Sequence, residues 1–269
     1  MTRRISYSHI AWDQDEEEAA GAVLMRRGIN AVDVAPGRYF PDPALTTRAD
    51  ALRVRDWWQS RGIDLLGMQA LLFGVAGLNL FGVPAHRTAL LERLTAVARV
   101  AGWLGATRLV FGSPKNRDRG ELSPEQALEI AIPFFRTLGE RAVGYGVQFC
   151  LEPNPTCYGC NFMTSTDEGA AVVRAIGHPG IRLHLDAGTM AINQEDPAVM
   201  VERHQNLVGY VHASEPDLNP VVDGPVHAAL GRALAAHLPT IPVSIEMRRA
   251  GLLALEPAIA STIGCYTIP

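Results

Sequence analysis

The feature that most constrains the fold is the alternation of short apolar segments with longer helix-like segments along the whole chain. Eight short segments are predicted strands, at residues 5–9, 31–34, 65–70, 108–111, 148–152, 182–186, 209–212 and 243–246. Helix candidates separate them, at 16–27, 48–60, 89–103, 124–145, 167–176, 198–205 and 227–236. Strands that alternate with helices indicate a parallel sheet, because parallel strands need a long crossover connection. Eight such units in 269 residues predict a closed (β/α)8 TIM barrel of the α/β class.

Local signals support these boundaries. Ser123-Pro124-Glu125-Gln126 has the pattern of a helix start, with a capping serine, proline at the first position and glutamine three residues after the cap. Glycines follow several predicted helices where the chain must turn back, at 62, 105, 146 and 177. A doubly wound open sheet is the competing architecture, but no GxGxxG turn follows the first strand. No repeat or linker divides the sequence, so we expect a single domain over residues 1–269.

Composition limits the classes of partner. Hydrophobic residues make up 48% and charged residues 19%, a balance typical of a folded core. A net charge of −4 offers no basic surface for a nucleic acid. The sequence begins without the apolar stretch of a signal peptide and has no run of membrane-spanning length, and its four cysteines are irregularly spaced. We therefore expect a cytoplasmic protein with a small-molecule partner and no membrane association, and a homo-oligomer stays open.

Ligand-type residues end the last four predicted strands: Glu152, Asp186, His212 and Glu246. They are separated by 34, 26 and 34 residues, about one strand–helix unit each. In a barrel this spacing places them on successive strands at the carboxyl-terminal rim, where barrel enzymes have their active sites. The sequence therefore predicts that the four side chains converge.

Three converging carboxylates repel one another unless protons or a cation neutralise them. One divalent ion held by three oxygens and one imidazole nitrogen satisfies this requirement, and such a donor set favours Mn²⁺, Mg²⁺ or Co²⁺, with Zn²⁺ as an alternative. The competing interpretation is structural, since each carboxylate could instead form an ion pair with a nearby arginine.

Four segments around these residues resemble the sugar isomerase/epimerase family: Leu-Glu-Pro-Asn (151–154), His-Leu-Asp-Ala-Gly (184–188), Val-His-Ala-Ser-Glu-Pro (211–216) and Ser-Ile-Glu-Met (244–247). That family has a xylose-isomerase-like TIM barrel, includes ketose 3-epimerases and many sugar-phosphate isomerases, and is related to endonuclease IV. Phe-Gly-Ser-Pro-Lys-Asn-Arg (111–117) also resembles one of its subgroups. The resemblance implies that Glu152, Asp186, His212 and Glu246 bind the metal and that the two glutamates are the catalytic acid/base pair.

The sequence departs from the ketose 3-epimerases at three positions. Thr189 stands where those enzymes have a histidine three residues after the aspartate, and Tyr158 stands where they have a second glutamate. An arginine that follows their metal-binding histidine has no counterpart in residues 215–219. The resemblance thus implies the fold and the metal site and leaves the substrate undetermined.

Further residues at predicted strand ends and nearby loops are candidate substrate contacts: His9, Trp12, Gln69, Lys115, Arg117, His184 and His227. Lys115 and Arg117 carry spare positive charge that could hold a phosphate or carboxylate. Trp12 and Phe73 could form an apolar wall. The competing interpretation for each is ordinary packing or a solvated surface position.

Three functions fit these residues. The first is an isomerase or epimerase of a sugar, sugar phosphate or related polyhydroxy carbonyl compound, with glutamate-mediated proton transfer through a metal-stabilised enediolate. The second is a metal-dependent lyase or dehydratase of a sugar-like or cyclitol substrate. A nuclease like endonuclease IV is disfavoured, because it needs further histidines and this chain has none between His9 and His86. A non-catalytic binding protein is the remaining alternative.

Overall fold

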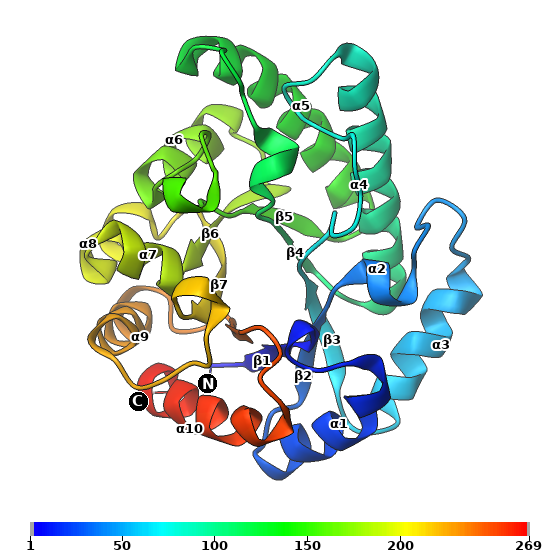
Figure 1. The fold of residues 1–269 in the computed structure, drawn as a ribbon, viewed down its shortest axis with the longest axis vertical. Helices are drawn as coiled ribbons and strands as arrows, with labels where there is room; N and C mark the ends of the chain where they lie inside the picture. Colours follow the sequence, from blue (N-terminus) through cyan, green and yellow to red (C-terminus); the bar gives the residue numbers. More distant parts are fainter. Residues whose placement is uncertain (1–2, 268–269) are drawn as a thin grey trace.

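The computed structural model describes residues 3–267, which form a closed barrel of eight parallel strands in chain order (Figure 1). The last strand pairs with the first, so the sheet has no open edge. The strands are β1 Ile5–Ser8, β2 Ala31–Val34, β3 Asp64–Met68, β4 Arg108–Phe111, β5 Gln148–Leu151, β6 Ile181–Asp186, β7 Val208–Ser214 and β8 Val243–Glu246. The predicted (β/α)8 TIM barrel is therefore confirmed.

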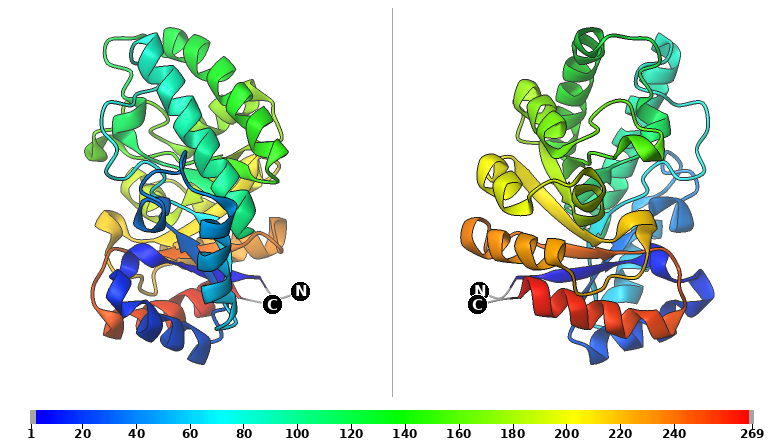
Figure 2. Two further views of the ribbon diagram at one scale, coloured as in Figure 1. Left: turned by 90° about the vertical axis from the view of Figure 1, so that its right-hand side faces the viewer. Right: turned by 60° about the vertical axis from the view of Figure 1, so that its left-hand side comes forward.

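Helices surround the barrel, and the long helices α4 and α5 lie side by side on its outside (Figure 2). The α-helices are α1 Glu17–Arg26, α2 Pro36–Tyr39, α3 Arg48–Gln59, α4 Pro84–Leu104, α5 Pro124–Gly144, α6 Thr166–Ile176, α7 Ala187–Asn193, α8 Pro197–His204, α9 Pro225–His237 and α10 Leu255–Tyr266. Within residues 3–267, none of these helices combines the length and the apolar character needed to cross a membrane.

The start of α5 shows how the sequence sets these boundaries. Ser123 accepts a hydrogen bond from the Gln126 amide at 3.3 Å, and the Ser123 amide donates to the Gln126 side chain at 2.9 Å. This reciprocal capping box satisfies two amide groups that the first helical turn leaves unpaired. At the other end of α4, Gly105 adopts φ 84°, a left-handed conformation that favours glycine. Both signals were read correctly from the sequence.

Helices α2, α7 and α10 were not predicted. Helix α7 begins directly at the end of β6, because Asp186 is both the last residue of the strand and the cap of the helix. Its side chain accepts a hydrogen bond from the Thr189 amide at 2.6 Å. A segment without a loop before it gives no separate start signal. Helix α10 packs against α1, α9 and β8 and covers the closing strands of the barrel.

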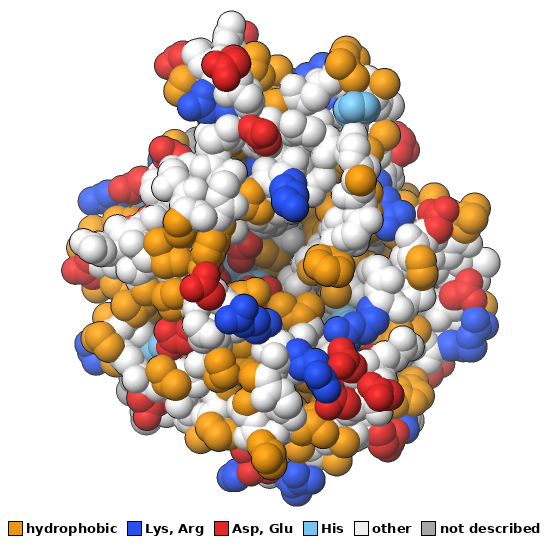
Figure 3. Space-filling view, viewed as in Figure 1, with side chains coloured by type: hydrophobic (Ala, Val, Ile, Leu, Met, Phe, Trp, Pro, Cys, Tyr) orange, Lys and Arg blue, Asp and Glu red, His pale blue; other side chains and the backbone are white. Residues whose placement is uncertain are grey.

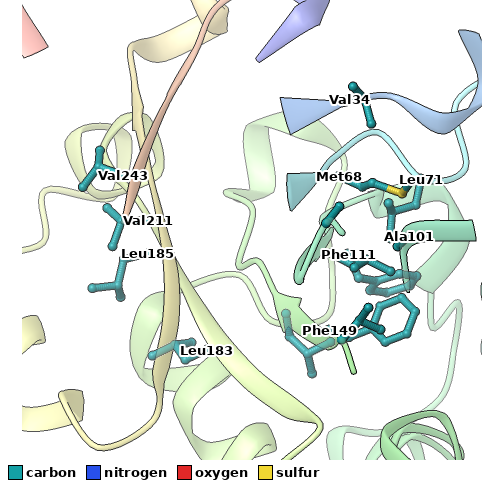
Figure 4. Packing of buried hydrophobic residues seen from close by; sticks show 14 of the residues in the cluster. Val34, Met68, Leu71, Ala101, Phe111, Phe149, Leu183, Leu185, Val211 and Val243 are labelled. Atoms are coloured by element: carbon teal, nitrogen blue, oxygen red, sulfur yellow. The ribbon is translucent and has the colours of Figure 1, made fainter. Parts of the chain in front are cut away.

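The hydrophobic core lies between the barrel and its helices. Figure 4 shows one row of side chains on neighbouring strands, with Leu183, Leu185, Val211 and Val243, and a second group around Phe111 and Phe149. The ring of Phe111 meets that of Phe135 on α5 edge-on, with centroids 5.5 Å apart. Each such buried side chain contributes about 1.5–3 kcal/mol, so this layer fixes where the strand ends lie.

The interior of the barrel is polar by contrast. The Tyr210 hydroxyl donates to the Asp33 carboxylate at 2.7 and 2.9 Å and accepts from Ser6 at 2.8 Å. Burial raises the pKa of Asp33, and the charge of His212 and the hydrogen bonds to the carboxylate oppose this effect. The hydroxyl of Tyr210 thus holds Asp33 in place.

Candidate metal centre

The four predicted ligands come together at the carboxyl-terminal rim of β5–β8. Each of Glu152, Asp186, His212 and Glu246 offers one ligand atom, and these atoms lie within 4.8 Å of one another. The Nδ1 atom of His212 lies 3.0 Å from Glu246 Oε2 and 3.5 Å from Glu152 Oε1. Register explains the convergence, since Asp186 pairs with His212 across β6 and β7.

The heights of the four residues differ slightly from the prediction. Glu152 follows the last residue of β5, while Asp186 and Glu246 end their strands. Strand β7 continues past His212 to Ser214, so the histidine is not the last residue of its strand. Ser214 pairs with Glu246 in the register of β7 and β8. The histidine therefore lies deeper in the barrel, where its side chain is fully buried.

Among the described residues, no arginine or lysine forms an ion pair with any of the three carboxylates. Within residues 3–267, the ion-pair partners of Glu152 and Glu246 are histidines, and Asp186 has none. Burial and the charge of Glu152 raise the pKa of Asp186. Burial lowers the pKa of His212, but the adjacent carboxylates of Glu246 and Glu152 outweigh it and raise this pKa well above its usual value. Negative charge gathered with only imidazole groups as partners is the electrostatic condition that a divalent cation satisfies.

Hydrogen bonds orient the carboxylates. Asn154 Nδ2 donates to Glu152 Oε2 at 3.2 Å. Asp186 accepts from the Thr189 amide at Oδ1 and from the Ser214 hydroxyl at Oδ2, both at 2.6 Å. Partners of this kind hold metal-binding side chains in one orientation and strengthen binding. The residues present therefore fit a divalent ion, with three carboxylates and one imidazole as donors.

His184 lies beside this cluster inside the barrel. Its ring is fully buried, stands edge-on to that of His212 with centroids 4.1 Å apart, and has Nδ1 3.4 Å from Glu152 Oε1. Neither ring nitrogen makes a hydrogen bond within residues 3–267. Burial, and secondly the charge of His212, hold its pKa well below the usual value, which keeps the imidazole neutral. With Glu152 and His212 it forms a second group of ligand-type atoms.

A cavity of about 870 Å³ opens above the cluster. Figure 3 shows the hollow in this face, with acidic and histidine side chains visible inside it. Glu152, Asp186 and Glu246 are among its lining residues. One wall is apolar and comes from β4 and the loop that follows β3, with Leu71, Leu72, Phe73, Val110 and Phe111. Polar groups on one side and apolar groups on the other are typical of a small-molecule site.

Gln69 is a further predicted substrate contact that lines this cavity, and its side-chain amide donates to Ser8 Oγ at 2.7 Å. His9 and Trp12 are fully buried and do not line it. The Ala35 amide donates to His9 Nδ1 at 3.0 Å, and the Trp12 ring packs against Tyr7 with centroids 5.8 Å apart. Both side chains turn into the core, because the loop after β1 folds into a short 3-10 helix, His9–Ala11.

Lys115, Arg117 and His227 do not reach the cavity either. Lys115 is exposed on a 3-10 helix, Pro114–Arg117, and Arg117 on the same turn is fully buried. His227 is buried on α9, where its Nε2 lies 3.1 Å from Glu215 Oε1 and its Nδ1 lies 2.7 Å from the Tyr266 hydroxyl. Only Glu215 of this chain of contacts lines the cavity.

Other lining residues were missed by sequence reasoning. These include Arg38, Glu215 and Arg248, while Tyr158 and Thr189 were noted only as departures from the ketose 3-epimerases. Glu215 stands three residues after His212, and Arg248 two residues after Glu246. Their closeness in sequence to predicted ligands was the available signal. Arg38 had no such signal, because only the path of α2 brings it over the barrel.

The fold and the cluster define a class, that of parallel (β/α)8 barrels with a carboxylate–imidazole centre at their carboxyl-terminal rim. The family model of the xylose isomerase-like TIM barrel matches residues 22–263, and the chain belongs to this family. A search of curated protein sequences found no match.

Solved structures share this barrel. A D-psicose 3-epimerase from Clostridium cellulolyticum H10 superposes with a TM-score of 0.80 at 15% identity, over 98% of this chain and 100% of that chain. The 3-keto-D-glucoside 4-epimerase YcjR from E. coli gives 0.78 at 14% identity, over 99% of this chain and 100% of that chain. The IolI protein with a bound zinc atom gives 0.75 at 14% identity, over 98% of each chain. At these identities the likeness establishes the fold alone.

Proposed function

We propose that this chain is a metal-dependent isomerase or epimerase of a sugar or a related polyhydroxy carbonyl compound. One observation carries the proposal: three carboxylates and an imidazole converge at the floor of a large cavity, with no arginine or lysine of residues 3–267 in an ion pair with them. Two of the similar structures are sugar epimerases by name, which supports the same class of reaction.

We assign Glu152, Asp186, His212 and Glu246 as the ligands of one divalent ion. Their oxygen-rich donor set favours Mn²⁺, Mg²⁺ or Co²⁺, and the zinc atom of the IolI structure keeps Zn²⁺ as an alternative. Such an ion, when bound, supplies a Lewis acid that polarises a carbonyl group and makes the neighbouring C–H more acidic.

We assign proton transfer to Glu152 and Glu246. Both carboxylates line the cavity, and their side chains are 14% and 12% exposed, so a substrate can reach them while most water is excluded. They extend from β5 and β8, which are separated by two strands, so they approach the cavity from different directions. One glutamate removes the proton from the carbon next to the carbonyl, and the other returns a proton from the opposite side. Asn154 holds Glu152 in place for this step.

Solvent exchange tests the assignment. In deuterated water the wild-type protein should introduce deuterium next to the carbonyl of a substrate, found by screening ketoses and aldoses. Glu152→Gln and Glu246→Gln should each reduce the rate about 10²–10⁴-fold, because a positioned base contributes that much. Glu129→Gln, at an exposed position on α5, is the matched control and should be fully active.

Metal content and melting temperature, measured on each variant, separate lost chemistry from lost structure. Full activity in both active-site variants would contradict the mechanism. A product lighter by one water molecule would indicate a lyase in place of an isomerase or epimerase.

A further inference from the structure

The inference concerns Arg38, which lines the cavity from α2. Its Nη1 donates to the carbonyl oxygen of His9 at 2.9 Å and to that of Trp12 at 2.6 Å. A terminal guanidinium nitrogen has two hydrogens, so both of those on Nη1 are used. The guanidinium group is thereby fixed to the loop after β1, and its position does not depend on a ligand.

The rest of this guanidinium has no partner in the part of the chain that the structure describes. Across residues 3–267, Nε and Nη2 of Arg38 make no hydrogen bond, and the side chain forms no ion pair. The charge of Glu17 acts on Arg38, but the two side chains form no ion pair, and the Glu17 carboxylate accepts a hydrogen bond from the Tyr39 hydroxyl at 2.6 Å. Nε and Nη2 together present two parallel N–H groups, which match the two oxygens of a carboxylate or a phosphate.

Arg248 adds a second cation to the same part of the cavity wall. It follows β8, and its amide donates to the Leu218 carbonyl at 2.9 Å. The side chain contacts only Asn219 Oδ1, at 3.3 Å, and has no ion pair in the described part of the chain. Strands β8 and β2 both pair with β1, so Arg248 and Arg38 stand on either side of the loop after β1.

The acids of the cavity do not neutralise these arginines. Glu152, Asp186 and Glu246 belong to the metal centre, and Glu215 contacts His227. A half-buried arginine that forms no ion pair among the described residues is well suited to an anionic ligand. Sequence reasoning expected this role for Lys115 and Arg117, but neither lines the cavity.

We propose that the substrate carries an anionic group, a carboxylate or a phosphate ester, which binds Nε and Nη2 of Arg38 with additional attraction from Arg248. This inference rests on the proposed function, because it takes the polyhydroxy carbonyl part of the substrate to lie at the metal centre. The substrate class is thus a sugar acid or a sugar phosphate, bound with its charged end near β1 and its carbonyl end near β5–β8.

Direct binding tests the proposal without turnover. Calorimetry on the metal-loaded protein should compare D-fructose, D-fructose 6-phosphate and D-glucuronate, so that the two anion types have separate arms. At least one anion should bind tenfold or more tightly than D-fructose. Arg38→Gln should lower the affinity for that anion about 10- to 100-fold, which is the usual contribution of charge-assisted hydrogen bonds. The affinity for D-fructose should not change.

Three further variants control for structure. Arg174→Gln removes an exposed arginine from α6 and should bind all three probes as the wild type does. Arg38→Lys keeps the charge but loses the two-pronged donor, so its affinity should lie between those of the wild type and Arg38→Gln. Arg248→Gln leaves the loop after β1 intact and should also weaken binding of the anion. This variant tests the proposal if Arg38→Gln proves unstable.

Three outcomes would overturn the proposal. The protein could bind D-fructose and both anions with equal affinity, or it could bind neither anion. Anion binding could also survive both Arg38→Gln and Arg248→Gln. Its failure is distinct from failure of the proposed function. Deuterium exchange with neutral sugars alone would overturn the anion site and leave the proposed isomerase function standing. Arg38-dependent anion binding without exchange would overturn the isomerase function and leave the anion site standing.

Discussion

Gly112→Ala is a severe and local test of the metal centre. Gly112 follows β4 directly, and a Cβ added to it would lie 1.8 Å from Glu152 Oε2 and 2.9 Å from Glu152 Cδ. Cβ atoms essentially never approach another heavy atom closer than 3.0 Å, so the carboxylate oxygen must move by about 1.2 Å. The three nearest atoms all belong to the Glu152 side chain, so the backbone need not shift.

The displacement is large for a metal site. Ligand distances in such sites vary by only about 0.2 Å, so Glu152 cannot keep its place as a donor. Loss of a residue that merely orients a ligand already costs about 10–100-fold in affinity, and displacement of the ligand itself should cost at least as much. Catalysis should fall by about 10²-fold or more, since a 1 Å misplacement has that effect. Stability should change by less than about 1 kcal/mol, because only one partly exposed side chain moves.

Metal titration by calorimetry, with elemental analysis of the purified protein, measures the effect. Gly144→Ala is the matched control: no atom lies within 4 Å of its added Cβ, and it ends helix α5. That variant should bind metal normally and melt at the same or a slightly higher temperature.

The Glu152→Ala background separates a local effect from a general one. If the new methyl group acts only on Glu152, adding Gly112→Ala to the Glu152→Ala variant should cause no further loss of metal affinity. Wild-type affinity in the single variant would refute the position assigned to Glu152, and an equal additional loss in the double variant would refute the local mechanism.

Three other predictions concern the metal ligands, the buried His9 and the cavity residue Glu215. Asp186→Ala and His212→Ala should each lose most bound metal in elemental analysis, and unchanged occupancy in both would exclude the site. Burial and the charge of Arg38 lower the pKa of His9 to about 3, so the unfolded state binds more protons below pH ~6.5, and stability falls by about 1.4 kcal/mol per unit as the pH decreases toward 3. His9→Gln should flatten this slope in urea titrations at pH 6.5 and 5.5, and an identical slope would contradict the assignment. Glu215→Gln should raise KM more than it lowers kcat, because Glu215 lines the cavity but is not a metal ligand, and a loss confined to kcat would argue instead for a role in proton transfer.

The barrel and its metal centre were predictable because both depend on periodic sequence features. Alternating apolar strands and helices specify the topology, and a parallel barrel brings the carboxyl ends of its strands to one rim. Residues at those ends, such as Glu152 and Asp186, must then converge, whatever the details of packing. The sequence therefore predicted which four side chains cluster, while the short β7 extension beyond His212 was missed, since strand ends depend on pairing with β6 and β8.

The cavity walls depended on tertiary structure, because loops are not periodic. Lys115 and Arg117 lie on the short turn that follows β4, yet one is exposed away from the cavity and the other is buried. Arg38 lies on a short helix with no motif, and two backbone carbonyls of a different loop place it over the barrel. The sequence by itself thus determined the barrel and the residues at its strand ends, because strand-like and helix-like segments alternate regularly along it. Only packing between separate loops decided which cations line the cavity.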